Sequence, residues 1–481
     1  MNKIPFWMIG FLSGAVFLLL LCFRLDFFNG LKPDESISSP ALKAGFELAG
    51  TDTWMNIFMN RQKIGYSRRV LIKKEAGYDF TDRSYLKLNL MGSPRDLFME
   101  TTGRFNPDFS LVSFRFDLSS GSLVFSAKGQ VKNHVLEMET PDRKIQFPLE
   151  ESVYLPGALM GGLKALDPAR GKTMEFQVFD PVVGASQKVL VRLEGKEIIE
   201  ISGKPTPSRK IFMEYKGLGQ HAWVDESGEV IQETGPMGLR LVKTTKEKAL
   251  SGFTVTSMED LTRSVSVAAN RILTRPEELA SLRIRLLNLP GSFQVNGGRQ
   301  TYENKVLTIT KENLDDLPSV PDPEAKQFFE PSPNIQSTDP EMKRLVSGLI
   351  SNAASDLEKA KILVNWVYEN IEKTPVISIP DALSTLKTRK GDCNEHAALL
   401  AAMARAAGIP AQMETGLVYM KGRFYYHAWN VLYLGDWITM DAALGQFPAD
   451  ATHIRLIRGD LASQFDLVQA MGKIQLEVFN D

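Results

Sequence analysis

The sequence predicts an α+β protein in which an antiparallel β region precedes a C-terminal region of mixed helices and strands. Three observations support this fold class. Apolar and polar residues alternate along segments of 50–325, apolar residues recur at helical spacing after about 337, and an alanine-rich segment with caps at both ends covers 393–407. Alternation is typical of half-buried strands, and recurrence every three to four residues is typical of amphipathic helices.

The length and composition limit the possible classes of protein. At 481 residues the chain is longer than one ordinary domain, so two to four folded units are expected. Its apolar content of 43% and charged content of 23% are those of a globular protein. The formal net charge of -1 argues against a nucleic-acid partner. Two cysteines are too few for a disulfide framework. The sequence does not indicate the oligomeric state.

An apolar segment opens the chain. About 20 residues from Ile4 to Phe23 match the length of a membrane-spanning helix. The bulky Leu21 and Phe23 do not resemble a signal-peptidase site, so an uncleaved transmembrane anchor over 1–25 is favoured over a cleaved signal peptide. The expected localisation is a single-pass membrane protein whose bulk is extracytoplasmic, and periplasmic if the source is Gram-negative. Residues 26–48 are expected to form a tether.

Strand patterns follow over residues 49–262, which are predicted to form an antiparallel β domain. Periodicity leaves a barrel and a sandwich open as alternatives. The predicted strands, which turn signals separate, include 69–73, 85–90, 123–128, 174–178 and 189–193. A small β unit and a proline-rich linker are expected over 263–334, with strands at 282–286 and 305–310 and a turn at 296–298 between them.

A domain that combines helices and strands is predicted over 335–481. Ser355 and Glu358 resemble a capping box, and the apolar residues that follow at helical spacing predict a core-facing helix ending near Ile371. Further on, 424–433 and 437–441 are predicted to pair as a hairpin with a three-residue loop.

Cys393 is the candidate nucleophile. Asp392 and Glu395 form a capping-box pattern, which places Cys393 at the first position of a helix that ends near Gly408. The unpaired N–H groups and positive dipole at a helix start favour a thiolate, so a lowered thiol pKa is expected. The alternative is that Cys393 is a small buried hydrophobe. His396 is expected to be a packing residue and the two acidic residues to be caps.

His427 and Asp441 are the candidate partners of this thiol. If Tyr433 pairs with Trp437 across the hairpin, His427 lies diagonal to Asp441 on the same face of the sheet. A carboxylate in that position fixes the tautomer of an imidazole and stabilises its charged form. The sequence therefore predicts a thiol, a base and an orienting acid, the components of a cysteine nucleophile.

A metal site is a rival interpretation of the same region. Cys393, His396, His427 and Asp441 are four residue types that bind zinc. The sequence lacks paired Cys-x-x-Cys or His-Glu-x-x-His spacing, so we predict neither a metal nor another cofactor.

The motifs at 388–397, 407–411, 426–429 and 437–441 together resemble those of the bacterial transglutaminase-like superfamily, over about 335–460. The resemblance implies a papain-like core in which a helix bearing the cysteine packs on an antiparallel sheet. It also implies that Cys393 is the nucleophile, His427 the general base and Asp441 the orienting acid. Ala442 departs from the proline that many members carry close to the aspartate, which loosens inference about the substrate.

These observations predict a membrane-anchored cysteine enzyme that acts on peptide or glutamine-type amides through a thioester, by hydrolysis or transamidation. The expected partners are a protein or peptide substrate and, through the N-terminal helix, a membrane. The alternative is a catalytically inert transglutaminase-like protein with a binding or assembly role at the membrane.

Overall fold

The computed structural model describes residues 50–479 with gaps. Residues 1–49 and 480–481 lie outside the described part, together with 91–92, 122, 141–142, 158, 160–172, 182–184, 216–217, 236–237, 253–259, 291–292, 294, 316, 318–322, 375–379, 460–466 and 468–469. The described residues divide into two compact units, 50–252 and 260–479, and each is treated by itself. The division into five segments that was drawn from the sequence stays a prediction.

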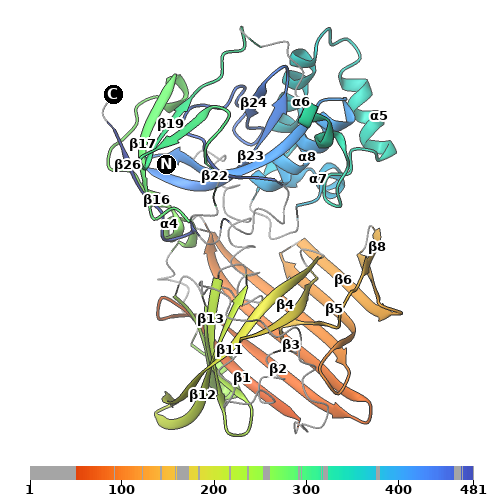
Figure 1. Ribbon diagram of the computed structural model, residues 1–481, viewed down its shortest axis with the longest axis vertical. Helices are drawn as coiled ribbons and strands as arrows, with labels where there is room; N and C mark the ends of the chain where they lie inside the picture. The colour runs from red at the N-terminus through yellow and green to blue at the C-terminus, as the bar shows by residue number, and fades with distance from the viewer. Residues whose placement is uncertain are drawn as a thin grey trace. The chain divides into compact units, whose positions relative to one another are not determined.

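The first unit is a continuous sheet of two meanders (Figure 1). In the described chain the strand order is β8-β7-β6-β5-β4-β3-β2-β1-β15-β14-β13-β12-β11-β10-β9, so the meanders join where β1 pairs antiparallel with β15. Only the short β9–β10 pair among these is parallel. The elements are β1 (Thr51–Met59), β2 (Gln62–Lys74), β3 (Gly77–Leu90), β4 (Ser93–Phe105), β5 (Leu111–Ser120), β6 (Leu123–Lys132), β7 (Val135–Thr140), β8 (Arg143–Pro148), β9 (Val153–Tyr154), β10 (Met174–Asp180), β11 (Ala185–Ile201), β12 (Lys204–Tyr215), β13 (Leu218–Asp225), β14 (Val230–Thr234), β15 (Leu239–Thr244) and the short helix α3 (Lys246–Leu250).

Alternating burial explains why these segments form strands. In β1 every second side chain from Thr53 to Met59 is buried, which is the pattern of a strand with one face on a core. The five strands predicted in this region fall within β2, β3, β6, β10 and β11. Two-residue turns with positive φ, at Asn60–Arg61 and Asn133–His134, close the β1–β2 and β6–β7 hairpins.

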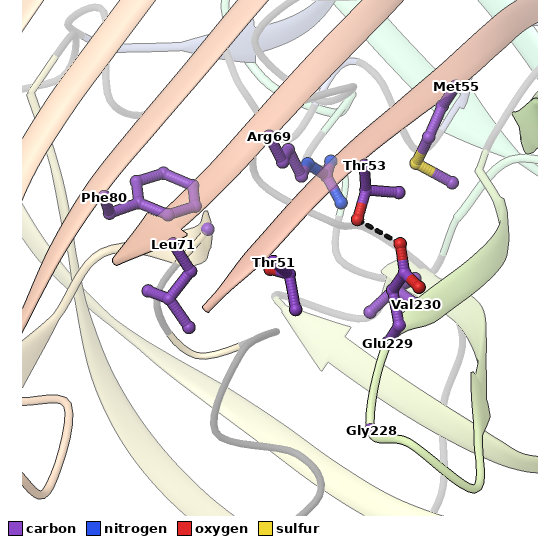
Figure 2. Close-up of a pocket in the computed structure, with 10 residues that line it drawn as sticks. Thr51, Thr53, Met55, Arg69, Leu71, Phe80, Gly228, Glu229 and Val230 are labelled. Carbon is purple, nitrogen blue, oxygen red and sulfur yellow. Dashed lines mark hydrogen bonds between the residues drawn. The ribbon is translucent and has the colours of Figure 1, made fainter. Parts of the chain in front are cut away.

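A pocket in this unit lies beside β1, β2 and the turn before β14 (Figure 2). Its charged groups are paired within the protein: Arg69 bonds to Asp82 at 3.1 Å, Glu229 pairs with Lys243, and Thr53 donates to Glu229. The lining residues are Thr51, Thr53, Met55, Arg69, Leu71, Phe80, Gly157, Gly228, Glu229 and Val230.

In its described part, the second unit combines helices with two larger sheets and a two-stranded parallel sheet, β20-β21 (Figure 1). One sheet has the order β16-β23-β22-β25 with β24 also on β23, and the other has the order β18-β19-β17-β26. The elements are α4 (Leu261–Val265), β16 (Val267–Ala268), η6 (Pro276–Glu278), β17 (Ser281–Leu287), β18 (Gln300–Glu303), β19 (Val306–Thr310), η7 (Pro323–Phe329), α5 (Pro340–Leu349), α6 (Asp356–Asn370), β20 (Glu372–Lys373), α7 (Ala382–Thr388), β21 (Lys390–Gly391), α8 (Cys393–Ala406), β22 (Ala411–Met420), β23 (Arg423–Tyr433), β24 (Trp437–Met440), β25 (Ile454–Arg458) and β26 (Gln475–Val478).

Helix α8 lies at the centre of this unit. Its residues from Cys393 to Ala404 are all buried, because α5, α6 and α7 pack on it together with β22 and β23. The predicted stripe on α6 is confirmed in its central part: Ala360, Leu363 and Val367 are buried in the same core as α8. The Asn430 side chain donates to the Ala397 carbonyl at 2.9 Å and ties β23 to this helix.

The β23–β24 hairpin has the predicted register. Tyr433 pairs with Trp437, and the pairing continues to Asn430 and Met440. The small sheet differs from the prediction in two respects, the first being that β26, from the C-terminal end of the described chain, pairs with β17. The predicted turn at 296–298 leads into β18, a strand that the sequence pattern missed, and the turn that precedes β19 lies at Asn304–Lys305, where both φ angles are positive.

The prediction of a transmembrane helix is not supported and is corrected. Across the part of the chain that the structure describes, no helix combines the length and the apolar character needed to cross a membrane. Single-pass membrane localisation, and the membrane as a partner, therefore lose their basis. Residues 1–25, for which the span was predicted, and the predicted tether at 26–48 lie outside the described residues.

Candidate active site

The first turn of α8 is held by a capping box. The Asp392 carboxylate accepts the Asn394 N–H at 2.8 Å, and the Glu395 carboxylate accepts the Asp392 N–H at 3.0 Å. This confirms the capping pattern read from the sequence. Gly391 is required beside it, because a Cβ at that position would lie 2.3 Å from the Glu395 Cβ. The cap therefore fixes the place of Cys393 through local contacts.

Replacing Gly391 with alanine should destabilise the second unit by about 2 kcal/mol, because the added methyl group displaces Glu395 and breaks the capping box. Urea unfolding followed by circular dichroism measures the loss. The matched control is Gly348→Ala in α5, where a Cβ meets nothing within 4 Å and a gain of about 0.5–1 kcal/mol is expected. Equal stability of the two variants would refute the steric argument.

Cys393 occupies the first position of α8 and is 3% exposed. Its sulfur accepts a hydrogen bond from the backbone N–H of Ala428, the residue that follows His427 on β23. Burial raises the pKa of the Cys393 thiol well above its ordinary value, and the Asp392 carboxylate adds to this effect. The expectation of a lowered thiol pKa is therefore wrong for this structure, because burial raises this pKa by more than the Ala428 hydrogen bond lowers it.

His427 and Asp441 meet as the hairpin register predicted. The His427 Nε2–H donates to Asp441 Oδ2 at 2.6 Å, and both side chains are buried. Burial lowers the pKa of His427 by more than the Asp441 carboxylate raises it. The Nε2 nitrogen carries the proton that it donates to Asp441, so protonation of the neutral ring takes place at Nδ1.

The Asp441 carboxylate accepts four hydrogen bonds. Its Oδ1 atom accepts the backbone N–H groups of Ala443 and Leu444 at 2.7 and 2.9 Å, and its Oδ2 atom accepts two imidazole nitrogens, from His427 and His453. Burial alone would raise the pKa of Asp441, but the two imidazoles and these bonds hold it well below its usual range. Asp441 is therefore an ionised carboxylate at neutral pH.

His453 is the residue of this site that sequence analysis missed. Its Nε2 atom lies 3.1 Å from Asp441 Oδ2. His453 sits 12 residues beyond Asp441, after a loop whose path shows no periodicity, so the spacing gave no reason to place the two together. The available signal was composition: the chain has only five histidines, and this one directly precedes the alternating segment that forms β25.

Trp429 forms one wall of the site. It is 1% exposed, donates from its indole N–H to Glu414 at 2.9 Å, and its ring contacts both His427 and His453. His396 lies inside α8, where its Nδ1–H donates to the Asp392 carbonyl at 2.6 Å. Burial lowers the pKa of His396 to about 4, so its ring is neutral at physiological pH.

The donor set fits a hydrogen-bonded site better than a metal centre. Among the described residues, His427, Asp441 and His453 offer ligand atoms within 4.8 Å of one another, and neither Cys393 nor His396 belongs to this group. Both imidazole Nε2 atoms approach a single oxygen, Asp441 Oδ2, at hydrogen-bond distance. These nitrogens carry protons that they donate, whereas a histidine ligand offers a lone pair to the metal.

The geometry is that of a thiol, an imidazole and a carboxylate on an α+β core. Residues 343–442 match the family model described as the Transglutaminase-like superfamily. The chain therefore contains a transglutaminase-like domain, and this match covers the helix that carries Cys393 and the hairpin that carries His427 and Asp441.

Two curated relatives match the same part of the chain. The Kyphoscoliosis peptidase of Mus musculus is 32% identical over 130 residues, which are 23% of this chain and 19% of that protein. The Kyphoscoliosis peptidase of Homo sapiens is 30% identical over 121 residues, 22% of this chain and 18% of that protein. The chain thus spans about a fifth of the length of these relatives, and the matches do not assign the bacterial branch that the motifs predicted.

Solved structures show more distant likeness. A β-barrel-like protein of the domain of unknown function DUF1849 from Brucella abortus is 11% identical, with a TM-score of 0.35, covering 41% of this chain and 97% of that chain. A protein described as a candidate cysteine protease from Cytophaga hutchinsonii is 18% identical, with a TM-score of 0.27, covering 42% and 82%. At these TM-scores the likeness adds nothing to the assignment of the site.

Proposed function

We propose that this chain is a cysteine acyl-transfer enzyme that acts on peptide or glutamine-type amides through a thioester, ending in hydrolysis or transamidation. Cys393 is the nucleophile, His427 the general base and Asp441 the orienting acid. Two observations carry the proposal: the 2.6 Å bond from His427 to Asp441, and a thiol at a capped helix start that takes the N–H of Ala428, the residue after His427. A protein or peptide is the proposed substrate, and the name of the curated relatives favours peptide hydrolysis as the first assay.

The pKa directions define how the reaction starts. The thiol pKa is raised and the His427 pKa is lowered, so the resting pair is a neutral thiol and a neutral imidazole. As the sulfur attacks the carbonyl carbon, the thiol proton passes to His427 Nδ1, and Asp441 stabilises the imidazolium that forms. The mechanism is therefore general-base catalysis, and it does not need a preformed thiolate.

The remaining steps balance protons and bonds. The tetrahedral intermediate collapses to a thioester, and the carbon–nitrogen bond breaks as the amine leaves with the proton from His427. Water, deprotonated by the same imidazole, then attacks the thioester and releases an acid and the Cys393 thiol. If a primary amine attacks in place of water, the product is a new amide, which is transamidation.

A catalytically inert binding or assembly protein is the second candidate. The burial of Cys393, at 3% exposed, favours it, because a substrate carbonyl must reach the sulfur for any reaction. The bonded pair of His427 and Asp441 supports the enzyme over this alternative, since a binding surface has no need for a fixed imidazole tautomer next to a thiol.

The test is to trap an acyl adduct on the full chain. Purified protein is mixed with a peptide library that includes glutamine peptides and a fluorescent primary amine, quenched in acid, and analysed by intact and peptide mass spectrometry. We expect an acyl adduct on Cys393 that is present in the matched control Cys22→Ala and absent in Cys393→Ala. New amino termini indicate peptide hydrolysis, released ammonia indicates action on glutamine, and amine incorporation indicates transamidation.

The inert alternative has its own signature in the same experiment. It predicts no adduct and no product from any donor, together with an iodoacetamide labelling rate at Cys393 that is unchanged in His427→Ala. The enzyme hypothesis predicts that His427→Ala lowers this labelling rate between pH 6 and 8, because the base that assists thiol deprotonation is missing.

A further inference from the structure

The imidazole of His453 lies between two carboxylates. Its Nε2 atom is 3.1 Å from Asp441 Oδ2, and its Nδ1 atom is 3.2 Å from Asp450 Oδ1. The ring is completely buried. Each ring nitrogen therefore faces a carboxylate oxygen in a site that excludes water.

Asp450, like Asp441, is an ionised carboxylate. Its Oδ1 atom accepts both the N–H and the hydroxyl of Thr452, at 2.8 and 2.6 Å, and its Oδ2 atom accepts the Gln446 amide at 2.9 Å. A carboxylate that accepts this many hydrogen bonds is strongly favoured in its charged form. Burial opposes the charge, but His453 and these bonds hold the pKa of Asp450 well below its usual range.

Two ionised carboxylates require a doubly protonated ring between them. A neutral imidazole has one N–H and one lone pair, so one of its nitrogens would place a lone pair against a carboxylate oxygen. An imidazolium donates from both nitrogens and fits both contacts. Burial opposes the charge on the ring, but Asp450 and Asp441 outweigh it and raise the pKa of His453 to about 9.

We propose that His453 is a permanently charged positioning residue that shares Asp441 with His427, fixes that carboxylate as an oriented anion, and keeps the His427 base neutral to lower pH. His453 does not contact the reacting atoms in this scheme; it acts through Asp441. The role of His427 as a base rests on the proposed function, whereas the charge on His453 can be measured without a substrate.

The effect on His427 follows from charge and distance. The two imidazole rings are 6.0 Å apart and donate to the same oxygen of Asp441. A positive His427 would be attracted by Asp441 but repelled by His453, so the second imidazolium opposes protonation of the first. Since a base must be neutral to accept the thiol proton, His453 widens the pH range in which His427 can work.

The other groups around His453 do not replace it in this role. The Trp429 ring meets the imidazole edge to face at 5.1 Å and is uncharged. The Arg299 guanidinium donates to the His453 backbone carbonyl at 3.0 Å, on the main chain and not on the ring. Among the described residues, the titratable side chains that contact this imidazole are Asp441, Asp450 and His427.

Selective labelling of histidine with ¹³C and ¹⁵N in the full chain tests the proposal, because only five histidines contribute signals. We expect one signal, assigned by its loss in His453→Gln, to keep both ring nitrogens protonated from pH 5 to 8. In the same variant we expect the pKa of His427 to rise by about 1–2 units, since charges about 6 Å apart interact at that level in a protein environment. The matched control His221→Gln, in the first unit, should leave the His427 pKa unchanged.

If the proposed function holds, the acid limb of kcat/KM in His453→Gln moves to higher pH by the same 1–2 units, because His427 then becomes protonated at higher pH. A merely structural role for His453 would lower activity equally at every pH. If the histidine signals show the expected protonation states and pKa change but no substrate is found, the charge on His453 is supported and the assignment as an enzyme fails. An active enzyme whose His427 pKa is the same in wild type and His453→Gln would overturn the proposal.

The wild-type spectrum keeps the test decisive if His453→Gln does not fold. A His453 signal that loses a proton near its ordinary value, about 6.5, would refute the permanent charge directly. Asp450→Asn provides a second variant, since the amide oxygen can still accept from the imidazole while the negative charge is removed. The pKa of His453 should fall by at least about 1 unit in that variant, and an unchanged value would count against the proposal.

Discussion

Asp441→Asn is expected to lower kcat/KM for the proposed reaction by about 10³–10⁴-fold, the size of effect seen when the orienting acid of a nucleophile–His–Asp site becomes an amide. The Asp441 Oδ2 atom accepts a hydrogen bond from His427 Nε2–H at 2.6 Å. An asparagine amide that presents its NH₂ group at this position forces the ring to carry its proton on Nδ1 instead. The nitrogen that should take the thiol proton is then blocked.

The measurement is kcat/KM across pH 5–9 with the donor found in the trapping experiment. Asp339→Asn is the matched control, because Asp339 caps α5 and asparagine caps a helix equally well, so activity and fold should be preserved. Retention of activity within tenfold in Asp441→Asn, in a folded protein, would contradict the assigned role. Such a result would leave the His427–Asp441 bond as a structural contact.

Arg299→Met is expected to destabilise the second unit by about 3–5 kcal/mol, because it removes one partner of a buried ion pair. The Arg299 side chain is 6% exposed and pairs with Glu312 at 3.2 Å. It also donates to the backbone carbonyls of Ala449, Asp450 and His453 at 2.8, 3.1 and 3.0 Å. Methionine fills the space but leaves the Glu312 carboxylate without its counter-ion and removes the guanidinium donor from three carbonyls.

Urea unfolding of the full chain measures this loss, and Arg285→Met is the matched control. Arg285 pairs with Glu477 on the surface, where both side chains are 44–49% exposed, so its removal should cost about 0–1 kcal/mol. A similar, small loss in both variants would show that the carbonyls of the loop before β25 do not depend on the guanidinium. That result would also remove the reason to expect Arg299 to hold His453 in place.

Local patterns predicted much of the second unit correctly. The capping box at Asp392 and Glu395, and the hairpin register that begins at Tyr433 and Trp437, involve residues within a few positions of each other. Such features depend on the backbone geometry of one turn or one hairpin, which neighbouring residues determine. The contact of His427 with Asp441 followed from the same register.

Contacts across the fold could not be predicted in this way. His453 reaches Asp441 only because the loop after β24 folds back, and Arg299, far earlier in the chain, holds that loop by its carbonyls. The predicted direction of the Cys393 thiol pKa was wrong for a related reason. The sequence indicates the helix start at Cys393, but how deeply the sulfur is buried depends on elements separated from it along the chain.

In the first unit, too, local elements were predicted from the sequence and contacts between distant segments were not. Alternation located the individual strands, yet the pairing of β1 with β15 joins segments almost 200 residues apart. Periodicity carries no information about such a pairing, which is why a barrel and a sandwich could not be told apart from the sequence.

The alanines of α8 have a consequence for protein engineering. Six alanines of α8, between positions 397 and 406, let neighbouring elements pack closely on the helix, and most of them are buried. Enlarging one of these side chains would displace α8 and move its first turn, which carries Cys393. A close-packed interior has no unfilled space to take up the extra volume. Attempts to change the selectivity of the proposed enzyme for its substrate should therefore vary positions on the surrounding strands and leave the alanines of α8 unchanged.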